Sequence, residues 1–387
     1  MSNILNNAFK IASLALISNL AQAQNISFGE ANQGMGQLDV SGWLRANIQD
    51  KSYSDQEHKL KFDAAKLELK YSRQKFEGEL EYRCYQFDKL CDFSSLVNAN
   101  LSYTPSPDHQ FKLGIQDIPF GPGRNWSSNW YGGVLVNTGL EDIHNLGLNY
   151  HFAVDQDTQF ELGYFARDAG RYTGKSLDSA RYSANYVQSD REYSHLNEKN
   201  MWLTRLQHQF SNLGTEALNL NLGGSYWYSD IENKTFHSTG HRHSWALFSQ
   251  IDYQALKFSL TAGRTDIDNK DPIHPHSAMM GSFDSSYAVA NKGSFYTADL
   301  IYTFGLFNSS SLSPYLTYSR LNKSEKGYVD SSRYIIGTQW NYKDISLVGE
   351  YIVGKNDLFI GGTDSAFAAG NSSGSESMLN LLFLYNF

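Results

Sequence analysis

The chain ends on Leu379-Asn380-Leu381-Leu382-Phe383-Leu384-Tyr385-Asn386-Phe387, where every second residue from Leu379 is apolar. A period of two is the pattern of a β-strand that turns one face toward an apolar environment. In a soluble fold, an apolar strand at the end of the chain would leave an edge that promotes aggregation. The same strand is stable when it closes a barrel and its apolar face meets lipid. The stretch therefore predicts the closing strand of a transmembrane β-barrel.

The same alternation recurs along the whole chain in segments of about ten residues, the length that a tilted membrane strand needs. Residues 65–72 and 76–83 are the clearest examples. The candidate segments begin near Leu38, Ala65, Phe76, Ser95, Gln110, Asn145, Thr158, Asn200, Leu218, His243, Lys257, Ser294, Leu312, Arg333, Ile345 and Met378. We therefore predict an all-β fold, a transmembrane antiparallel β-barrel of about 16 strands.

The connections between these segments alternate in length. Short linkers lie at residues 73–75, 105–109, 154–157, 254–256 and 343–344, whereas long polar linkers span 168–199, 268–293 and 355–377. Short periplasmic turns and long external loops are typical of outer-membrane barrels. A soluble β-sandwich has no reason to alternate in this way over its whole length.

Composition supports the same class of protein. No stretch approaches 18 consecutive apolar residues, which excludes a helical membrane protein. The chain is 14% aromatic with 31 glycines, and its mean hydropathy is −0.46, as a barrel with a lipid face and a wet lumen requires. The net charge of −8 argues against a strongly basic anion trap. Phosphate-binding glycine loops and nucleic-acid patches are absent from the sequence, so we expect no cofactor and no nucleic-acid partner.

The first 23 residues have the features of a secretory signal. Lys10 precedes an apolar run at 11–20, and Ala21-Gln22-Ala23 offers small residues to a signal peptidase. The alternative is a short membrane anchor, but the run is shorter than the ~20 residues of a spanning helix. We expect a signal peptide at 1–23 and one barrel domain at 24–387. In an oxidising periplasm, Cys84 and Cys91 are expected to pair across one hairpin end.

Strand parity divides the side chains between lipid and lumen. The inward set is polar and carries both signs of charge: Arg45, Asn47, Lys66, Glu68, Lys70, Glu77, Glu79, Glu81, Arg83, Lys112, Gln116, Glu161, Arg205, Gln207, Asp299, Arg333, Gln339 and Glu350. Barrels of this size leave an aqueous channel. The wall is either simply hydrated or part of a selective constriction.

The segment at 120–144, a long third external loop, is the candidate filter. Its glycines allow it to turn into the lumen, where opposed charges across a narrow channel select solutes by charge and size. The candidate constriction residues are Arg124, Trp126, Trp130, Tyr131, Glu141 and Asp142 of the loop, with Arg45, Lys66, Lys70, Arg83 and Arg205 of the wall. The acids of the loop are expected to face the cations of the wall. The alternative is an external loop with packed aromatics.

Residues 65–124 resemble a known family. Lys66-Leu67-Glu68-Leu69-Lys70-Tyr71, Phe76-Glu77-Gly78-Glu79-Leu80-Glu81-Tyr82 and Leu113-Gly114-Ile115-Gln116-Asp117-Ile118-Pro119-Phe120-Gly121 are similar to the phosphate-selective O/P-type porins. This resemblance implies a 16-stranded, trimeric diffusion channel. The aromatic end of the chain also resembles the terminal strand that the barrel-assembly machinery of the bacterial outer membrane reads.

Together these features predict an outer-membrane porin that passes small hydrophilic solutes or ions by passive diffusion. Its expected surroundings are outer-membrane lipid and lipopolysaccharide, with a homotrimer as the expected assembly. Two rival classes are an outer-membrane lipase or protease and a structural or adhesive barrel with a closed lumen. The sequence contains no G-x-S-x-G motif, so we expect no enzyme. The histidines at 237–243 and 274–276 lie in loops without cysteine ligands, and no metal site is predicted from them.

Overall fold

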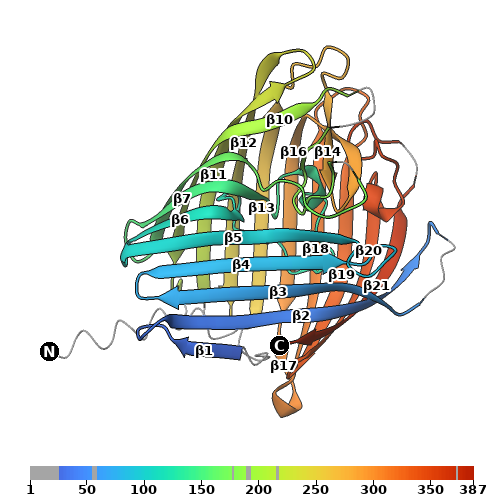
Figure 1. Cartoon of the computed structure of the whole chain (residues 1–387). Coiled ribbons are helices and arrows are strands. Elements are labelled where there is room, and N and C mark those ends of the chain that lie inside the picture. Colours follow the sequence, from blue (N-terminus) through green and yellow to red (C-terminus); the bar gives the residue numbers. More distant parts are fainter. Residues whose placement is uncertain (1–25, 55–58, 177, 189–192, 215–217, 372–373) are drawn as a thin grey trace.

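The computed structural model describes residues 26–54, 59–176, 178–188, 193–214, 218–371 and 374–387, so the predicted signal peptide lies outside the described residues. The described chain forms a closed antiparallel β-barrel of 16 strands (Figure 1). The barrel strands are β2 (Gly36–Lys51), β3 (Lys61–Arg73), β4 (Phe76–Tyr85), β5 (Phe93–Ser106), β6 (His109–Asp117), β7 (His144–Ala153), β8 (Thr158–Asp168), β10 (Leu196–Phe210), β11 (Leu218–Asn233), β12 (Ser238–Tyr253), β13 (Leu256–Ile267), β16 (Lys292–Tyr302), β18 (Ser311–Lys323), β19 (Ser331–Tyr342), β20 (Ile345–Lys355) and β21 (Glu376–Asn386). Each predicted segment forms one of these strands.

The last strand closes the barrel, as its sequence predicted. β21 pairs with β20 on one side and with β2 on the other. Phe387 completes the ladder, because its N–H donates to the Gly42 carbonyl and its carbonyl accepts from the Gly42 N–H. Beyond this point β1 (Ile26–Glu30) pairs with the start of β2, which covers an edge that would otherwise stay unpaired.

The outer surface is a lipid-facing band. In β21 the side chains of Leu379, Phe383 and Tyr385 are 40–52% exposed and point outward, whereas Asn380 and Leu382 are buried inside. β12 shows the same strict alternation of exposed and buried side chains over most of its length. Only a membrane stabilises an exposed apolar face that runs around a closed sheet. The protein is thus a transmembrane β-barrel of the bacterial outer membrane.

Short turns gather at one end of the barrel. Two residues connect β3 to β4, β12 to β13, and β19 to β20, and Gln74, Gln254 and Lys343 have positive φ in these turns. Positive φ is what a tight hairpin turn requires to match the twist of its strands. The longest loops lie at the opposite end: L3 (118–143), L4 (169–195), L6 (268–291) and L8 (356–375). We take this second end as the external one.

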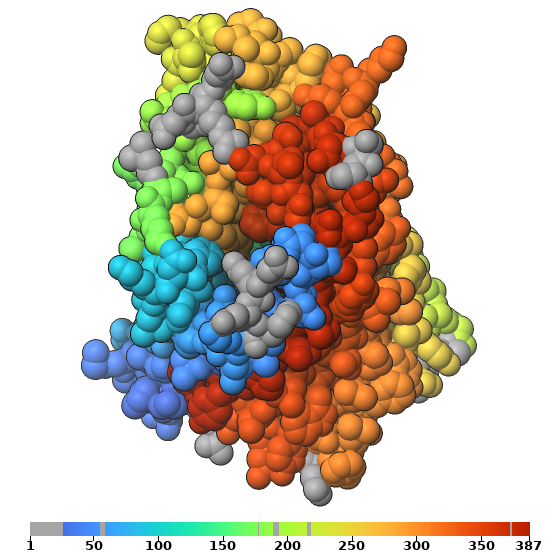
Figure 2. Space-filling view, turned by 90° about the vertical axis from the view of Figure 1, so that its right-hand side faces the viewer, coloured from blue at the N-terminus to red at the C-terminus, as the bar shows by residue number. Residues whose placement is uncertain are grey.

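Loops fold into the external half of the barrel. L6 contains a hairpin of β14 (Ser277–Ser282) and β15 (Ser285–Ala290), which pairs with β9 (Asn185–Tyr186) of L4 in a second sheet. Figure 1 shows β14 within the outline of the barrel wall. On the face shown in Figure 2, L8 lies beside the loop after β2, and the Tyr53 hydroxyl donates to the Phe359 carbonyl at 3.2 Å.

The inside of the barrel differs from the simple wet lumen that strand parity indicates. A buried apolar cluster joins L3, the β14–β15 hairpin and inward side chains of the wall, including Phe165, Leu203 and Phe295. A second cluster lines the inner face from β18 to β21 and β2. Parity identifies which residues point inward, but it does not show that a loop will pack apolar side chains onto them. No helix in the described residues is long and apolar enough to cross a membrane.

Candidate pore constriction

L3 leaves the wall through a turn that only glycine fits. Gly121 has φ of +67°, and a Cβ at this position would lie 2.4 Å from the Trp126 ring. The Gly121 N–H donates to Ser225 Oγ of β11 at 2.8 Å, and its carbonyl accepts from Arg205 of β10. The loop therefore turns across the lumen instead of outward into solvent.

A buried aromatic group holds the first part of L3. Trp126 is 2% exposed, and its ring lies 5.8 Å from the Phe295 ring and 6.0 Å from the Phe120 ring. Phe120 in turn packs edge-on against Trp227 of β11 at 5.6 Å. These contacts join the loop to β11 and β16, and burial of such large rings gives L3 much of its stability.

Polar anchors hold the middle of L3 against the opposite wall. The Trp130 N–H donates to Glu350 of β20 at 2.7 Å, and the Ser128 hydroxyl donates to Asp299 of β16 at 2.6 Å. The Val134 N–H donates to Ser319 of β18 at 2.8 Å. L3 thus contacts strands on both sides of the barrel and narrows the lumen.

Arg333 of β19 anchors two loops at once. Its guanidinium donates to the Gly132 carbonyl of L3 at 2.7 Å and makes two bonds to Asp357 of L8 at 2.7 and 2.8 Å. The side chains of Arg333 and Asp357 are both fully buried. A buried ion pair with bidentate geometry needs this complete set of partners to offset its desolvation.

A charge cluster joins L3 to the wall at β4. Arg124 binds Glu81 of β4 at 2.7 Å and Asp142 at 2.8 Å, and Asp142 also accepts from His144 and from the Tyr182 hydroxyl. Burial alone would raise the pKa of Asp142, but the Arg124 guanidinium and the His144 contact hold it well below its usual range. Asp142 is therefore charged, and the loop is fixed to β4 through opposite charges.

The predicted cations of the wall fall into two groups. Some lie against L3 or its partners, and the others bind carboxylates of the wall away from L3. Arg83 binds Glu81 and the Tyr182 hydroxyl, next to the Arg124 contact. Arg205 binds Glu161 of β8 and the Gly121 carbonyl. In contrast, Arg45 pairs with Asp63, and both Lys66 and Lys70 pair with Glu68 at 2.7 Å. The expectation that L3 acids face Arg45 and Lys70 is therefore wrong, because these cations bind acids on the same or the neighbouring strand.

Two loop residues also differ from their expected positions. Trp126 was a candidate for the constriction, but its ring is buried in the aromatic group described above. Glu141 was expected opposite wall cations, but it is 3% exposed and one carboxylate oxygen accepts from the Trp126 N–H. The other oxygen has no partner among the described residues. Burial, with Asp142 and Asp299 nearby, raises the pKa of Glu141 to about 8.

Trp130 and Tyr131 remain partly exposed at the middle of L3. The Trp130 indole N–H donates to Gln339 of β19, and the Tyr131 hydroxyl donates to the Phe359 carbonyl of L8. Both aromatic side chains are therefore held in place by the wall or by a neighbouring loop.

The residues of β16, β19 and β20 that anchor L3 were not predicted as part of the site. Asp299, Arg333 and Glu350 were assigned to the inward face but not to the site. Glu350 accepts from the Trp130 and Tyr131 N–H groups and from the Tyr315 hydroxyl, and Arg333 has the contacts given above. A single charged residue among uncharged inward neighbours was the available signal, because a buried charge requires specific partners.

The structure also joins Cys84, at the end of β4, to Cys91 in a disulfide that closes the loop before β5. In the same loop, Asp92 accepts from the N–H groups of Phe87, Asp88 and Lys89. Burial opposes ionisation of Asp92, but these bonds together lower its pKa to about 2. The disulfide and the Asp92 bonds fix this loop at the external end of β4, next to the Arg124 cluster.

Solved structures share this architecture. The outer membrane channel DcaP of Acinetobacter baumannii aligns with a TM-score of 0.59 at 11% identity, over 93% of this chain and 99% of that chain. OmpF of Salmonella typhi, in a complex with daunomycin, aligns with a TM-score of 0.59 at 11% identity, over 94% and 100%. An anion-selective porin from Comamonas acidovorans gives 0.55 at 11% identity, over 90% and 99%. The shared fold is the porin-type barrel.

No family model matches the chain, and no curated protein matches it either. At 11% identity the solved structures establish the fold alone. The resemblance of residues 65–124 to the O/P-type porins remains a prediction.

Proposed function

We propose that the protein is a porin-type channel that passes small hydrophilic solutes or ions by passive diffusion, and that L3 forms its constriction. The observation that carries the proposal is the path of L3, which is bonded to β4 through Arg124 and to β18–β20 through Ser319, Arg333 and Glu350. A loop fixed on both sides of a lumen sets the width and the charge of the remaining passage.

The charge of the described wall favours cations or neutral solutes over phosphate. Arg45, Lys66 and Arg205 are each paired with a carboxylate. Asp299 and Glu350 accept hydrogen bonds from neutral groups, and no cationic partner of either is found among the described residues. We therefore propose a channel that is not phosphate-selective, in contrast to the family that residues 65–124 resemble.

We propose a channel and not a hydrolase. A hydrolase needs a nucleophile bonded to a base that a third group orients. Both ring nitrogens of His144 are already engaged, one by Asn98 and the other by Asp142. The nearby Ser183 hydroxyl accepts from the His144 backbone N–H and does not contact the ring. We propose a homotrimer as the assembly, as expected for a porin.

Planar-bilayer recording tests the channel. We expect the purified protein to give stable conductance steps, and we expect larger steps after residues 123–141 are replaced by a short glycine-serine linker. Correct folding of both proteins is verified by the heat-dependent shift in gel mobility. Absence of conductance from the folded wild-type barrel would support a closed structural barrel instead, and equal steps from the two proteins would remove L3 from the constriction.

A further inference from the structure

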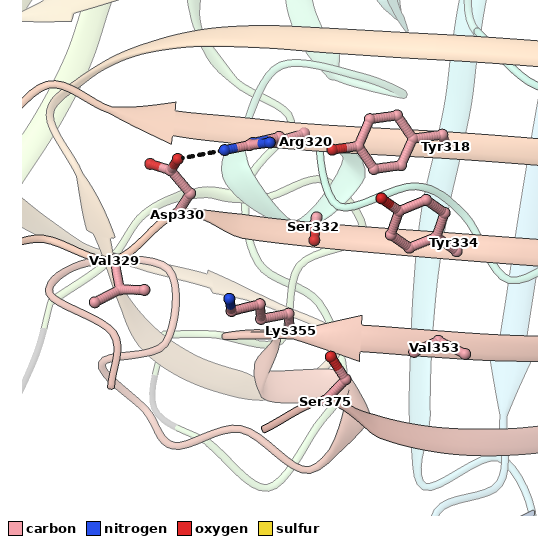
Figure 3. A pocket seen from close by; sticks show the side chains of 9 residues that line it. All are labelled: Tyr318, Arg320, Val329, Asp330, Ser332, Tyr334, Val353, Lys355 and Ser375. Atoms are coloured by element: carbon pink, nitrogen blue, oxygen red, sulfur yellow. Dashed lines mark hydrogen bonds and ion pairs between the residues drawn. The ribbon is translucent and has the colours of Figure 1, made fainter. Parts of the chain in front are cut away.

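The outer surface of the barrel contains a pocket of about 380 Å³ at the external ends of β18, β19 and β20 (Figure 3). We call it the rim pocket and define it by Tyr318, Arg320, Asp330, Ser332, Tyr334 and Lys355. Parity places these strand side chains outside, because Ser319, Ser331, Arg333 and Gly354, next to them in sequence, are buried within the barrel. The rim pocket therefore faces the membrane and not the channel.

The register of the strands arranges this outer face in three rows. Leu316, Ile336 and Tyr351 lie side by side and are 48–62% exposed, as side chains that meet lipid acyl chains would be. The next row toward the external end holds Tyr318 paired with Tyr334, whose rings stack with centroids 4.4 Å apart. Tyrosine rings at this level are typical of the membrane–water interface.

The third row is cationic. Arg320 pairs with Ser332, and Ser332 pairs with Lys355 on the next strand. Strands lie ~4.8 Å apart, so Arg320 and Lys355 start about 10 Å from each other with a hydroxyl between them. Figure 3 shows their charged ends on the same side of the pocket, away from the two tyrosine rings.

The balance of charge in the pocket favours an anion. Arg320 binds Asp330 at 2.7 Å, and this pair is partly exposed. Lys355 is exposed and has no carboxylate partner among the described residues. One acid against two cations leaves a net positive site with a hydroxyl donor, which suits the tetrahedral oxygens of a phosphate group.

We propose that the rim pocket binds the phosphorylated headgroup of a glycolipid in the outer leaflet, a lipopolysaccharide. Arg320 and Lys355 hold the phosphate from two sides, and Ser332 donates a hydrogen bond to it. The Tyr318 and Tyr334 rings lie against the sugar, and the acyl chains follow the row of Leu316, Ile336 and Tyr351. This binding requires only that the barrel spans a membrane, whatever its lumen conducts.

The choice of occupant follows from the continuity of the three rows. A soluble phosphate would contact only the cationic row and would leave the adjoining apolar row without a ligand. A lipid with acyl chains but no phosphate would leave Lys355 without an anionic partner at the membrane surface, although Arg320 would keep Asp330. An anionic amphiphile can contact all three rows at once, with its acyl chains on the apolar row and its charged headgroup on the cationic row.

The test uses the full-length barrel in detergent with three probes: bisphosphorylated lipid A, the same lipid after removal of its phosphates, and inorganic phosphate. Binding is followed by the shift in apparent Tm and by native mass spectrometry. The test variant is R320Q/K355Q. The control is K257Q/K343Q, which removes two cations near the periplasmic turns and so keeps the net charge equal.

We expect lipid A to bind and stabilise the wild type and the control equally, and to bind R320Q/K355Q on the order of 30-fold more weakly, about fivefold for each basic side chain near a membrane surface. The dephosphorylated lipid should bind the wild type as weakly as lipid A binds the variant. Equal lipid A affinity of the variant and the control would overturn the proposal. So would an equal response to inorganic phosphate, which indicates a soluble-anion site. We expect the variant to fold, because a partly exposed pair such as Arg320–Asp330 contributes little to stability. Heat-dependent gel mobility without lipid verifies this folding.

Discussion

Glu141 is the residue in L3 whose environment departs most from what its type prefers. Its side chain is buried, one oxygen has no partner among the described residues, and its pKa is raised to about 8. In the unfolded chain a glutamate ionises near pH 4.5. Between these two values the folded protein holds a proton that the unfolded chain has lost. Stability from this group is therefore complete below about pH 4.5 and is lost as the pH rises through 8.

We predict that Glu141→Gln stabilises the barrel at high pH. Glutamine keeps an oxygen that accepts from the Trp126 N–H and never acquires a charge. The gain should be small at pH 5 and rise toward pH 9, with an upper bound of about 5 kcal/mol. Apparent Tm in detergent at pH 5, 7 and 9 measures this difference. Glu77→Gln, at an exposed lumen position, serves as the control and should show no such trend. A gain that does not change with pH would contradict the prediction.

At the scale of single residues, the sequence predicted which way a side chain points better than it predicted which residues that side chain contacts. Arg45, Glu81 and Arg205 point inward as parity requires, because alternation along a strand is a property of the backbone. Their partners were not predictable, since pairing depends on register and on where L3 crosses the lumen. Trp126 shows the same limit: an aromatic in a glycine-rich loop was expected at the pore, and the fold buries it against Phe295.

At the scale of elements, L3 and L8 depend on one another through Arg333. Its side chain joins the Gly132 carbonyl of L3 to the Asp357 carboxylate of L8 in a fully buried position. Removing one charge leaves the other buried and unpaired, which costs about 3–5 kcal/mol. L3 would lose its contact with β19 at the same time, so an effect on conductance should accompany the loss of stability.

We predict that Arg333→Gln lowers the apparent Tm and raises the single-channel conductance or its noise. The double variant R333Q/D357N should recover part of the stability, because no unpaired charge remains. It should recover little of the conductance, because the bonds from Arg333 to L3 are still absent. Thermal melts and bilayer recordings on both variants measure the two effects. Wild-type conductance in Arg333→Gln would show that L3 is held without this anchor.

The strands were predictable as elements and the loops were not. All 16 barrel strands were found from period-two alternation, including β21 at the end of the chain. The alternation of connection lengths is not strict, because only four residues link β11 to β12 at the external end, whereas eight lie between β16 and β18 at the periplasmic end. The sheet of β9, β14 and β15 was missed entirely, because it joins L4 to L6, segments about 90 residues apart. Local patterns carry no information about such distant pairing.

At the scale of the whole molecule, the outer and inner faces of the barrel carry different kinds of side chain. The outer face exposes apolar rows such as Leu316, Ile336 and Tyr351, and the rim pocket lies beyond them toward the external end. The inner face is filled in part by L3 and its apolar partners, so we expect a barrel wide enough for a large channel to hold a narrow one. The conductance of the wild type should therefore be small for a barrel of 16 strands.

The charge of the passage beside L3 sets which ions the channel is expected to prefer. The wall cations Arg45, Lys66 and Arg205 are each bound to a carboxylate, whereas Asp299 and Glu350 bind only neutral donors among the described residues. We therefore expect a negative field across L3, and a negative field in a low-dielectric channel raises the local concentration of cations. In a KCl gradient across a bilayer, the reversal potential should have the sign of a cation-preferring channel. Asp299→Asn should move it toward zero, whereas K257Q/K343Q, at the periplasmic end, should not reduce the cation preference. A reversal potential of the opposite sign in the wild type would show that the anion selectivity of the O/P-type porins applies to this barrel after all.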